Sequence, residues 1–313
     1  MADVKKIATR ESYGNALKEL AEEFPNLVVL DADLAAATKT GIFKKAYPDR
    51  HIDCGIAESN MMGVAAGLSL TGKIPFCSSF AMFAAGRAFE QVRNSIGYPH
   101  LNVKIGATHA GITVGEDGAS HQCNEDIALM RTIPGMVVMC PSDDVEAKAA
   151  VRAALEHEGP VYIRFGRAAV PVINDKPDYK FEIGKGTVVR EGSDVTIVAT
   201  GICVDSALGA AEKLAADGIN AEVVNICTIK PLDEEIILAS AKKTGKVVTV
   251  EEHSVIGGLG SAVCDCLSAK LPTPVKKIGM QDVFGESGSA AALVAKYGLD
   301  ADGVYASVKE FLA

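Results

Sequence analysis

The chain has 313 residues, more than one small domain holds and enough for two domains of about 100–200 residues each. It is 48% hydrophobic and 23% charged, the composition of a globular protein with ample material for a core. Its formal net charge of −9 argues against a general electrostatic partnership with nucleic acid, so we expect no nucleic-acid partner.

The N-terminal segment MADVKKIATRESYGNALKEL has no apolar stretch of the kind found in a secretory signal. No apolar run approaches the roughly 20 residues that a membrane helix needs, so we expect a cytoplasmic chain without a membrane partner. None of the eight cysteines forms a Cys-x-x-Cys pair, and most lie in apolar stretches. Buried free thiols are the simplest interpretation, rather than disulfides or a metal site on this chain.

Short apolar runs alternate with amphipathic stretches through the first half of the chain. The apolar runs predict strands at 27–33, 51–56, 74–79, 102–108, 136–140 and 161–165. The stretches between them predict helices at 9–24, 58–70 and 143–157. Because these strands are almost continuously apolar, the alternation favours a parallel sheet covered by helices on both faces.

A polar segment rich in proline and glycine, PVINDKPDYKFEIGKG, interrupts this pattern at 171–186 and is the natural linker. Beyond it the alternation resumes, with strands expected at 194–200, 221–226, 246–252 and 274–279. Helices are expected at about 202–217, 232–243, 259–270 and 302–312. The sequence therefore predicts an α/β fold with two domains, 1–170 and 187–313, each a mostly parallel sheet flanked by helices.

A first candidate site lies in HIDCGIAESNMMGVAAGL, where a strand ends near Ile56 and a helix begins at Glu58. Ligands of parallel α/β sheets gather at the carboxyl ends of the strands, which is where Glu58 is expected. Taken alone, Glu58 can equally be an acidic residue stabilised by a helix N-terminus.

A second candidate is the long segment THAGITVGEDGASHQCNEDIALMRTIPGM, which follows the strand predicted at 102–108. It contains His109 and His121, with Asp117 between glycines, and such residues suit proton transfer and hydroxyl recognition. A polar surface loop is the alternative. Metal binding is a weaker one, because eleven residues separate the two histidines.

Two arginines and a group of phenylalanines complete the candidates. Arg164 and Arg167 follow the strand predicted at 161–165, and a guanidinium suits phosphate because it donates paired hydrogen bonds. Either arginine, taken singly, can instead belong to a structural salt bridge. Phe80 and Phe83 begin a helical stretch, where aromatic residues usually form core but can also make a slot for a flat ring.

Together these segments resemble the C-terminal half of transketolase and of deoxyxylulose-phosphate synthase, over nearly the whole chain. The strongest match is GEDGASHQCNEDIALMRTIPGM, which is similar to a substrate loop of transketolases. DCGIAESNMMGVAAGL resembles the segment that bears the cofactor glutamate, while ICTIKPLD and VFGESGSAAALVAKYGLDA resemble the C-terminal domain. The matches occur in the order found in the family.

The resemblance implies a thiamine-diphosphate enzyme in which Glu58 hydrogen-bonds a ring nitrogen of the aminopyrimidine and favours its imino form. It implies that Phe80 and Phe83 lie at the pocket of that ring, although a tyrosine of some transketolases is replaced near Gly86. A helix N-terminus favours an ionised Glu58 and burial favours the neutral acid. Because the chemistry needs a shared proton, we expect burial to dominate.

The same resemblance implies roles for the substrate residues. His109 and His121 match histidines that contact oxygens of the donor sugar, and both are candidate catalytic residues. Asp117 matches an aspartate that binds a substrate hydroxyl. The phosphate-binding arginine is matched first by Arg167 and second by Arg164.

The sequence lacks the Gly-Asp-Gly motif through which the family binds the diphosphate and its Mg²⁺ or Ca²⁺ in a separate N-terminal domain. We therefore expect a partner, a transketolase N-terminal subunit that carries the metal, and two copies of each chain in a heterotetramer. The expected enzyme is a transketolase of the pentose phosphate type, active on sugar phosphates only with that partner.

Three other functions stay open. Half of a deoxyxylulose-phosphate synthase and a 2-oxo-acid dehydrogenase β chain share the domain pair, but the GEDGASHQ loop favours transketolase. A non-catalytic subunit that keeps only the fold is disfavoured by the candidate site residues. The sequence does not determine the ketose donor, the aldose acceptor or the pathway.

Overall fold

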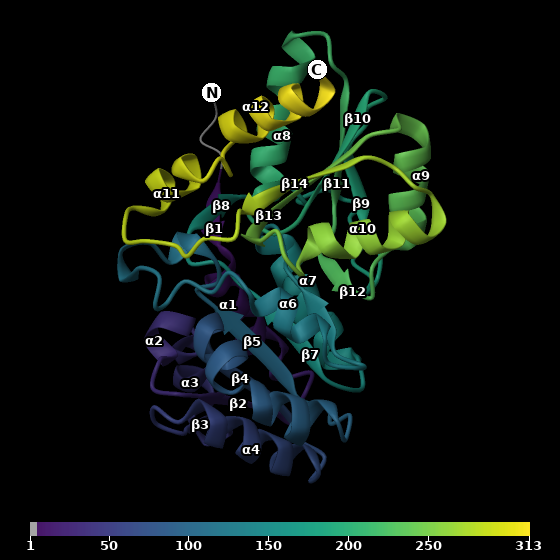
Figure 1. The fold of residues 1–313 in the computed structure, drawn as a ribbon. Helices are drawn as coiled ribbons and strands as arrows, with labels where there is room; N and C mark the ends of the chain where they lie inside the picture. The colour runs from purple at the N-terminus through teal and green to yellow at the C-terminus, as the bar shows by residue number, and fades with distance from the viewer. Residues whose placement is uncertain (1–4) are drawn as a thin grey trace.

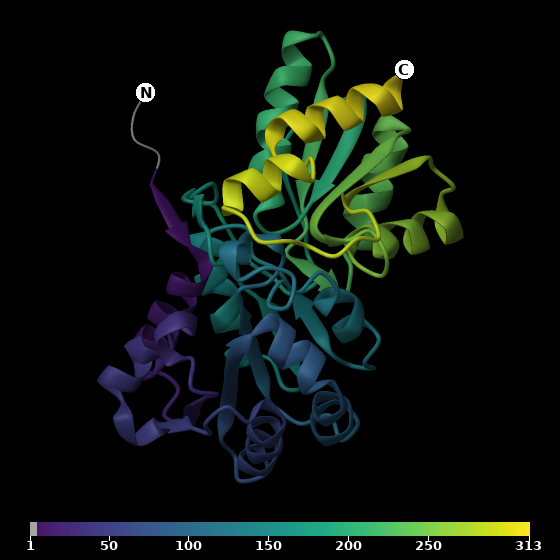
Figure 2. The ribbon, with the colours of Figure 1, turned by 60° about the vertical axis from the view of Figure 1, so that its left-hand side comes forward.

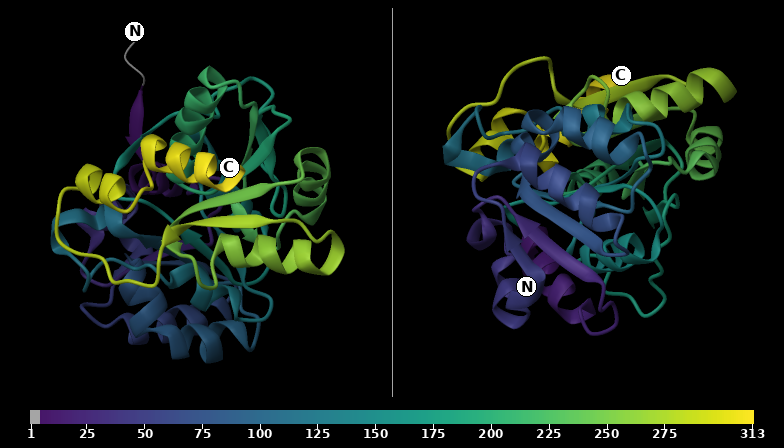
Figure 3. Two further views of the ribbon diagram at one scale, coloured as in Figure 1. Left: turned by 45° about the horizontal axis from the view of Figure 1, so that its top comes forward. Right: turned by 90° about the horizontal axis from the view of Figure 1, so that it is seen from below.

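The structure is a computed structural model that describes residues 5–313 and comprises two α/β units (Figure 1). The first unit is coloured purple to teal and the second green to yellow, and further views show helices on both sides of the sheets (Figures 2 and 3). The predicted fold class is confirmed, since both sheets are mostly parallel and flanked by helices. Within residues 5–313 no helix is both long and apolar enough to cross a membrane.

The first unit is built on a seven-stranded sheet with the order β12-β6-β7-β5-β4-β2-β3. Its parallel strands are β2 (Leu27–Asp31), β3 (His51–Asp53), β4 (Ile74–Phe80), β5 (Lys104–Thr108), β6 (Val137–Met139) and β7 (Val161–Arg164). Its α-helices are α1 (Thr9–Leu20), α2 (Ala35–Thr38), α3 (Gly41–Ala46), α4 (Glu58–Ser69), α5 (Phe89–Gln91), α6 (Asp126–Arg131) and α7 (Asp144–Glu156).

Alternate residues of each strand supply the two faces of this sheet. Val29 of β2 packs with the cluster that includes α1 and α7, whereas Leu30 packs with the cluster that includes α4 and α6. Side chains of a strand point to opposite faces in turn, so a strand buried on both faces has to be apolar throughout. This accounts for the continuous apolar runs in the sequence.

The second unit has a five-stranded sheet with the order β14-β13-β10-β11-β9. Its strands are β9 (Thr187–Arg190), β10 (Val195–Ala199), β11 (Ala221–Asn225), β13 (Val247–Ser254) and β14 (Val275–Met280), and only β9 is antiparallel to its neighbour. Its helices are α8 (Cys203–Ala216), α9 (Glu234–Thr244), α10 (Leu259–Lys270), α11 (Ala290–Lys296) and α12 (Ala301–Leu312).

The structure contains short strands that the sequence did not predict, and one of them joins the two units. β12 (Thr228–Lys230) leaves the second unit and pairs antiparallel with β6, so it extends the sheet of the first unit (Figure 1). β1 (Lys6–Ala8) pairs with β8 (Ala169–Pro171) in a separate two-stranded ribbon. β1, β8 and β12 have three residues each and lie outside the apolar runs from which strands were predicted, so no pattern marked them.

The segment predicted as a linker, 171–186, packs against the first unit. The backbone N–H of Asn174 donates to Oδ2 of Asp143 at 2.7 Å, and Asn174 itself is buried. Phe181 and Ile183 pack against the core cluster that includes α1 and α7. The segment has little regular secondary structure, but these contacts hold it against the first unit.

A buried arginine connects the two units beside the long loop after β5. The Nε of Arg164 donates to Asp126 at 2.9 Å, and Nη2 donates to the carbonyl oxygens of Cys123 and Glu252 at 3.3 and 2.7 Å. Tyr162 donates to the same Asp126 at 2.8 Å. Arg164 is only 4% exposed and Asp126 is fully buried, so the pair depends on these hydrogen bonds to offset its lost hydration.

We predict that Arg164→Met destabilises the chain by about 3–5 kcal/mol, because it leaves Asp126 as an unpaired buried charge. Urea-induced unfolding near neutral pH measures the loss. Arg152→Met is the matched control, since Arg152 makes a two-pronged pair with Glu23 on the exposed surface and should contribute little. Equal effects of the two substitutions would contradict this role for Arg164.

Candidate functional site

The candidate residues converge on one edge of the first sheet, where the parallel strands end. Phe80 is the last residue of β4, His109 follows β5, Arg167 follows β7 and Glu58 begins α4 after β3. In the sheet, β3 lies beside β2 at one edge, whereas β5 lies on the opposite side of β4, towards the other edge. The connections after β2 and after β4 therefore run in opposite directions. Such a change of direction opens a crevice at the carboxyl ends of the strands, the usual place for a ligand.

Glu58 forms part of the wall of a cavity of about 250 Å³ at this edge. Its side chain is only 2% exposed and accepts hydrogen bonds from Nη1 of Arg87 at 3.1 Å to both carboxylate oxygens. Phe83 lines the same cavity, and the guanidinium carbon of Arg87 lies over its ring, 4.6 Å from the centroid. The remaining lining residues are Ala32, Asp33, Leu34 and Ile56.

Phe83 and Arg87 lie on a widened helical segment, 82–97. Its backbone makes hydrogen bonds over five residues, from the N–H of Ala88 to the oxygen of Phe83 and from Tyr98 to Arg93, at 3.1 and 2.8 Å. Such π-helical turns are uncommon and occur often at functional sites. They set the angles at which Phe83 and Arg87 approach the Glu58 cavity.

Phe80 and Phe83 join the two histidines in one aromatic cluster. The Phe80 ring stacks on His109 with 3.9 Å between centroids, and Phe83 lies 6.0 Å from Phe80 at an interplanar angle of 13°. His121 meets Phe83 edge-on at 5.4 Å, and its Nδ1 lies 3.0 Å from the hydroxyl of Ser120. The structure therefore brings together two phenylalanines and two histidines that were separate candidates in the sequence.

His109 is buried among cations. Its Nδ1 lies 2.9 Å from the Thr108 hydroxyl, and its Nε2 lies 3.0 Å from Nη1 of Arg10, which can only donate. Nε2 is therefore the acceptor and the proton belongs on Nδ1. Burial above all, and then the charges of Arg10, Arg167 and Lys39, lower the pKa of His109 to about 3.

Arg167 lies at the open side of this cluster. Its Nη1 donates to the carbonyl oxygen of Val114 and to Glu116 at 3.1 Å, and its side chain is 37% exposed. Burial and the charge of Arg167 lower the pKa of Arg10, which places the two guanidinium groups in one electrostatic environment. Arg10 also donates to the carbonyl oxygen of Ala37 at 2.9 Å, so it connects the loop after β2 to His109.

The structure places Arg164, the second choice for a phosphate ligand, in the interior of the chain. Although Arg164 precedes Arg167 by only three residues, it is a strand residue whose side chain points into the interior. Its Nε and Nη2 are engaged by Asp126 and two carbonyl oxygens. A phosphate at the sheet edge therefore cannot use it without breaking the contacts between the two units.

Asp117 ends a turn, Ile112–Asp117, that is bent sharply at Gly115 (φ 85°) and followed by Gly118 (φ 76°). The Asp117 side chain is exposed beyond the histidines, with no partner among the hydrogen bonds of the described residues. The turn is anchored from below by Gln122, whose Nε2 donates to the carbonyl oxygens of Ile112 and Glu286 at 3.2 and 2.8 Å.

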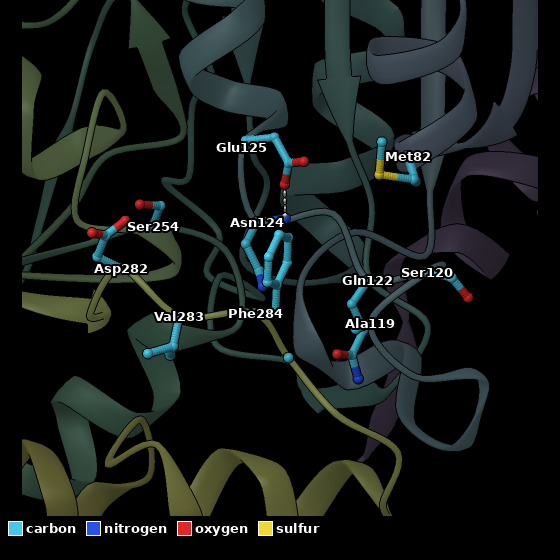
Figure 4. Close-up of a pocket in the computed structure, with 11 residues that line it drawn as sticks. Met82, Ala119, Ser120, Gln122, Asn124, Glu125, Ser254, Asp282, Val283 and Phe284 are labelled. Atoms are coloured by element: carbon cyan, nitrogen blue, oxygen red, sulfur yellow. Dashed lines mark hydrogen bonds between the residues drawn. The ribbon is translucent and has the colours of Figure 1, made fainter.

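A larger cavity of about 530 Å³ lies behind this turn, between the first and second units (Figure 4). Gln122, Asn124 and Glu125 line one side, and Asp282, Val283 and Phe284 line the other. None of the catalytic candidates from the sequence lines it. In residues 5–313 no group of three or more histidine, cysteine, aspartate or glutamate side chains has the geometry of a metal site.

Sequence reasoning missed Arg10, Lys39 and Arg87. Arg10 is the second residue of α1, and Lys39 lies between the short helices α2 and α3. Arg87 lies on the π-helical segment, whose register no pattern of 3.6 residues reproduces. The cations around buried His109 come from segments far apart in the sequence, so only the folded structure shows that they are neighbours.

Comparison with known proteins gives one consistent family. Residues 5–172 match the family model "Transketolase, pyrimidine binding domain", and residues 184–304 match "Transketolase, C-terminal domain". A protein of Methanocaldococcus jannaschii named putative transketolase C-terminal section is 52% identical over 96% of this chain and 95% of its own length. A 6-deoxy-6-sulfo-D-fructose transketolase subunit of a Clostridium species is 48% identical, covering 96% and 93%.

A solved structure of a split gene transketolase, described as an inactive beta4 tetramer, superposes with a TM-score of 0.90. It is 57% identical in sequence, and the match covers 98% of this chain and 99% of that one. Human transketolase is 38% identical, but the match spans only 49% of that longer protein.

We predict that the His109 ring remains neutral from about pH 8 down to about pH 4.5, whereas an ordinary imidazole is protonated near pH 6.5. The Cε1 chemical shift of labelled histidine reports this directly. Below about pH 6.5 the unfolded chain gains a proton at His109 that the folded chain does not, so this group makes folding less favourable as the pH falls towards about 3. In Arg10→Met the ring should protonate at a higher pH than in the wild type.

Proposed function

The chain belongs to the transketolase family, and on this premise we propose that it is the C-terminal subunit of a split transketolase. It would transfer a two-carbon ketol unit from a ketose phosphate to an aldose phosphate. The observation that carries the proposal is Glu58, a buried carboxylate on the wall of a cavity that it shares with Phe83. That cavity lies at the carboxyl edge of the sheet, beside a cluster of histidines and cations.

The Glu58 cavity suits the aminopyrimidine ring of thiamine diphosphate. A carboxylate that is almost fully buried matches a ring nitrogen, and the face of Phe83 offers an apolar wall for a flat ring. When bound, the cofactor would supply a nucleophilic ring carbon for the ketose carbonyl, and its positively charged ring would accept the electron pair released when the adjacent carbon–carbon bond breaks. Glu58 would hold the proton that the pyrimidine nitrogen needs, and Phe80 would support the ring through its contact with Phe83.

The substrate residues extend outward from this cavity. His109 and His121 are proposed to contact oxygens of the donor sugar, with His109 as a neutral ring that has its proton on Nδ1. Asp117, exposed on the turn beyond them, is proposed to bind a sugar hydroxyl. Arg167 is proposed to bind the phosphate, helped by Arg10 and Lys39, whose charges act on the same histidine.

The diphosphate and its Mg²⁺ or Ca²⁺ are assigned to a separate N-terminal subunit, because this sequence has no Gly-Asp-Gly motif. We propose a heterotetramer with two copies of each chain. We also propose the domain boundaries: a pyrimidine-binding domain at 1–170, a linker at 171–186 and a C-terminal domain at 187–313. Relatives named for sulfofructose and for apulose-4-phosphate support a range of ketose substrates, so the pentose phosphate pathway is one setting among several.

We predict that the chain alone shows no ketol transfer and that the pair with the N-terminal subunit does. In that pair, Glu58→Gln should reduce affinity for thiamine diphosphate only modestly but slow exchange of the thiazolium carbon-bound proton by about 10²–10⁴-fold. The exchange is followed by NMR after a deuterium quench, with Glu90→Gln, an exposed glutamate on α5 that does not line the cavity, as the control. An unchanged exchange rate in Glu58→Gln would refute the role of Glu58.

We predict that Arg167→Ala weakens phosphorylated ketoses by about ten- to a hundredfold and leaves unphosphorylated ketoses nearly unaffected. The reason is the loss of a charge-assisted hydrogen bond that only the phosphate makes. The measurement is KM for matched pairs of substrates in the assembled enzyme. Arg152→Ala, far from the sheet edge on α7, is the control for removal of an exposed arginine. Equal losses for both kinds of ketose would reject the assignment.

A further inference from the structure

Arg87 occupies the Glu58 cavity in a way that the proposed function does not use. Its Nη1 donates to both oxygens of Glu58 at 3.1 Å, and its guanidinium lies over the Phe83 ring at 4.6 Å. These two contacts engage the same carboxylate and the same aromatic face that a bound ring would need. The Arg87 side chain is nevertheless 52% exposed, so only its tip is committed to the cavity.

A guanidinium has much of the character of an aminopyrimidine at such a position. It is planar, its N–H groups donate to a carboxylate, and it stacks on an aromatic ring. Glu58 is 2% exposed, and an unpaired carboxylate at that depth would be strongly destabilising. Arg87 therefore satisfies a charge that would otherwise have no partner while the cavity holds no ring.

We propose that Arg87 is a placeholder for the cofactor ring: it pairs with Glu58 in the separate chain and leaves when a nitrogen heterocycle enters the cavity. The inference rests on the proposed function of the Glu58 cavity. Because more than half of the Arg87 side chain is exposed, it can rotate into solvent without unpacking the core. Arg87 is the last residue of the π-helical segment Met82–Arg87.

The experiment compares Arg87→Met with the wild type in the pair with the N-terminal subunit. Arg87→Met leaves Glu58 without a partner until the ring binds, so thiamine diphosphate should bind about two- to fivefold more tightly. This range corresponds to the free energy of a partly exposed ion pair, which the wild type has to break. The gain should shrink as salt is added, because salt weakens the ion pair that the wild type has to break. Exchange of the thiazolium carbon-bound proton should change by less than about twofold.

Arg93→Met is the matched control, since Arg93 is exposed on the same helical segment and does not line the cavity. Arg87→Lys keeps the charge without the flat group and should bind the cofactor with an affinity between the wild type and Arg87→Met. Weaker binding in Arg87→Met, with exchange slowed as in Glu58→Gln, would mean that Arg87 stays beside Glu58 as a fixed support and would overturn the proposal. Equal behaviour of Arg87→Met and Arg93→Met would also overturn it.

A readout on the separate chain keeps this test distinct from that of the proposed function. The pyrimidine fragment 4-amino-5-hydroxymethyl-2-methylpyrimidine, titrated into the chain alone, should bind Arg87→Met more tightly than the wild type. If the assembled pair binds no thiamine diphosphate, the proposed function fails. If the pair binds the cofactor but Arg87→Met and the wild type have equal affinities for thiamine diphosphate and for the pyrimidine fragment, only the placeholder role of Arg87 is refuted.

Discussion

The geometry of the candidate site depends on the buried guanidinium of Arg164. This group holds Asp126 at the start of α6, the carbonyl of Cys123 before it and the carbonyl of Glu252 in the second unit. The long loop that bears His109, Asp117 and His121 is thereby fixed at its far end, and the second unit is fixed against it. Arg164, which the sequence offers as a ligand for phosphate, instead holds the loop that bears the candidate residues.

The sequence predicted the fold class and most of the long elements, because strands buried on both faces leave continuous apolar runs. It also placed Glu58, His109 and Arg167 after predicted strands, and the carboxyl ends of parallel strands share one edge of the sheet. It did not predict Arg10 or Arg87. Arg10 lies on α1, whose helix was predicted, but its contact with His109 joins residues 99 positions apart in the sequence. Arg87 lies on a π-helical segment, which has no periodicity that a sequence reveals.

The charge at the edge of the first sheet has the opposite sign to the net charge of the chain. The chain carries a formal net charge of −9, yet the sheet edge gathers Arg10, Lys39 and Arg167 around His109. The ring responds by staying neutral, because burial and three cations oppose a further positive charge. A neutral imidazole at this position does not compete for an anion that the cations attract.

The short strand β12 has a consequence for how the chain reaches its folded state. An uncovered outer strand is a template for pairing with other chains, and β6 would be such a strand if β12 did not cover it. During synthesis the first unit is complete well before residues 228–230 emerge, so its sheet remains open on that side for some time. A fragment cut at the end of the first unit should therefore be prone to self-association, because it lacks the strand that covers β6.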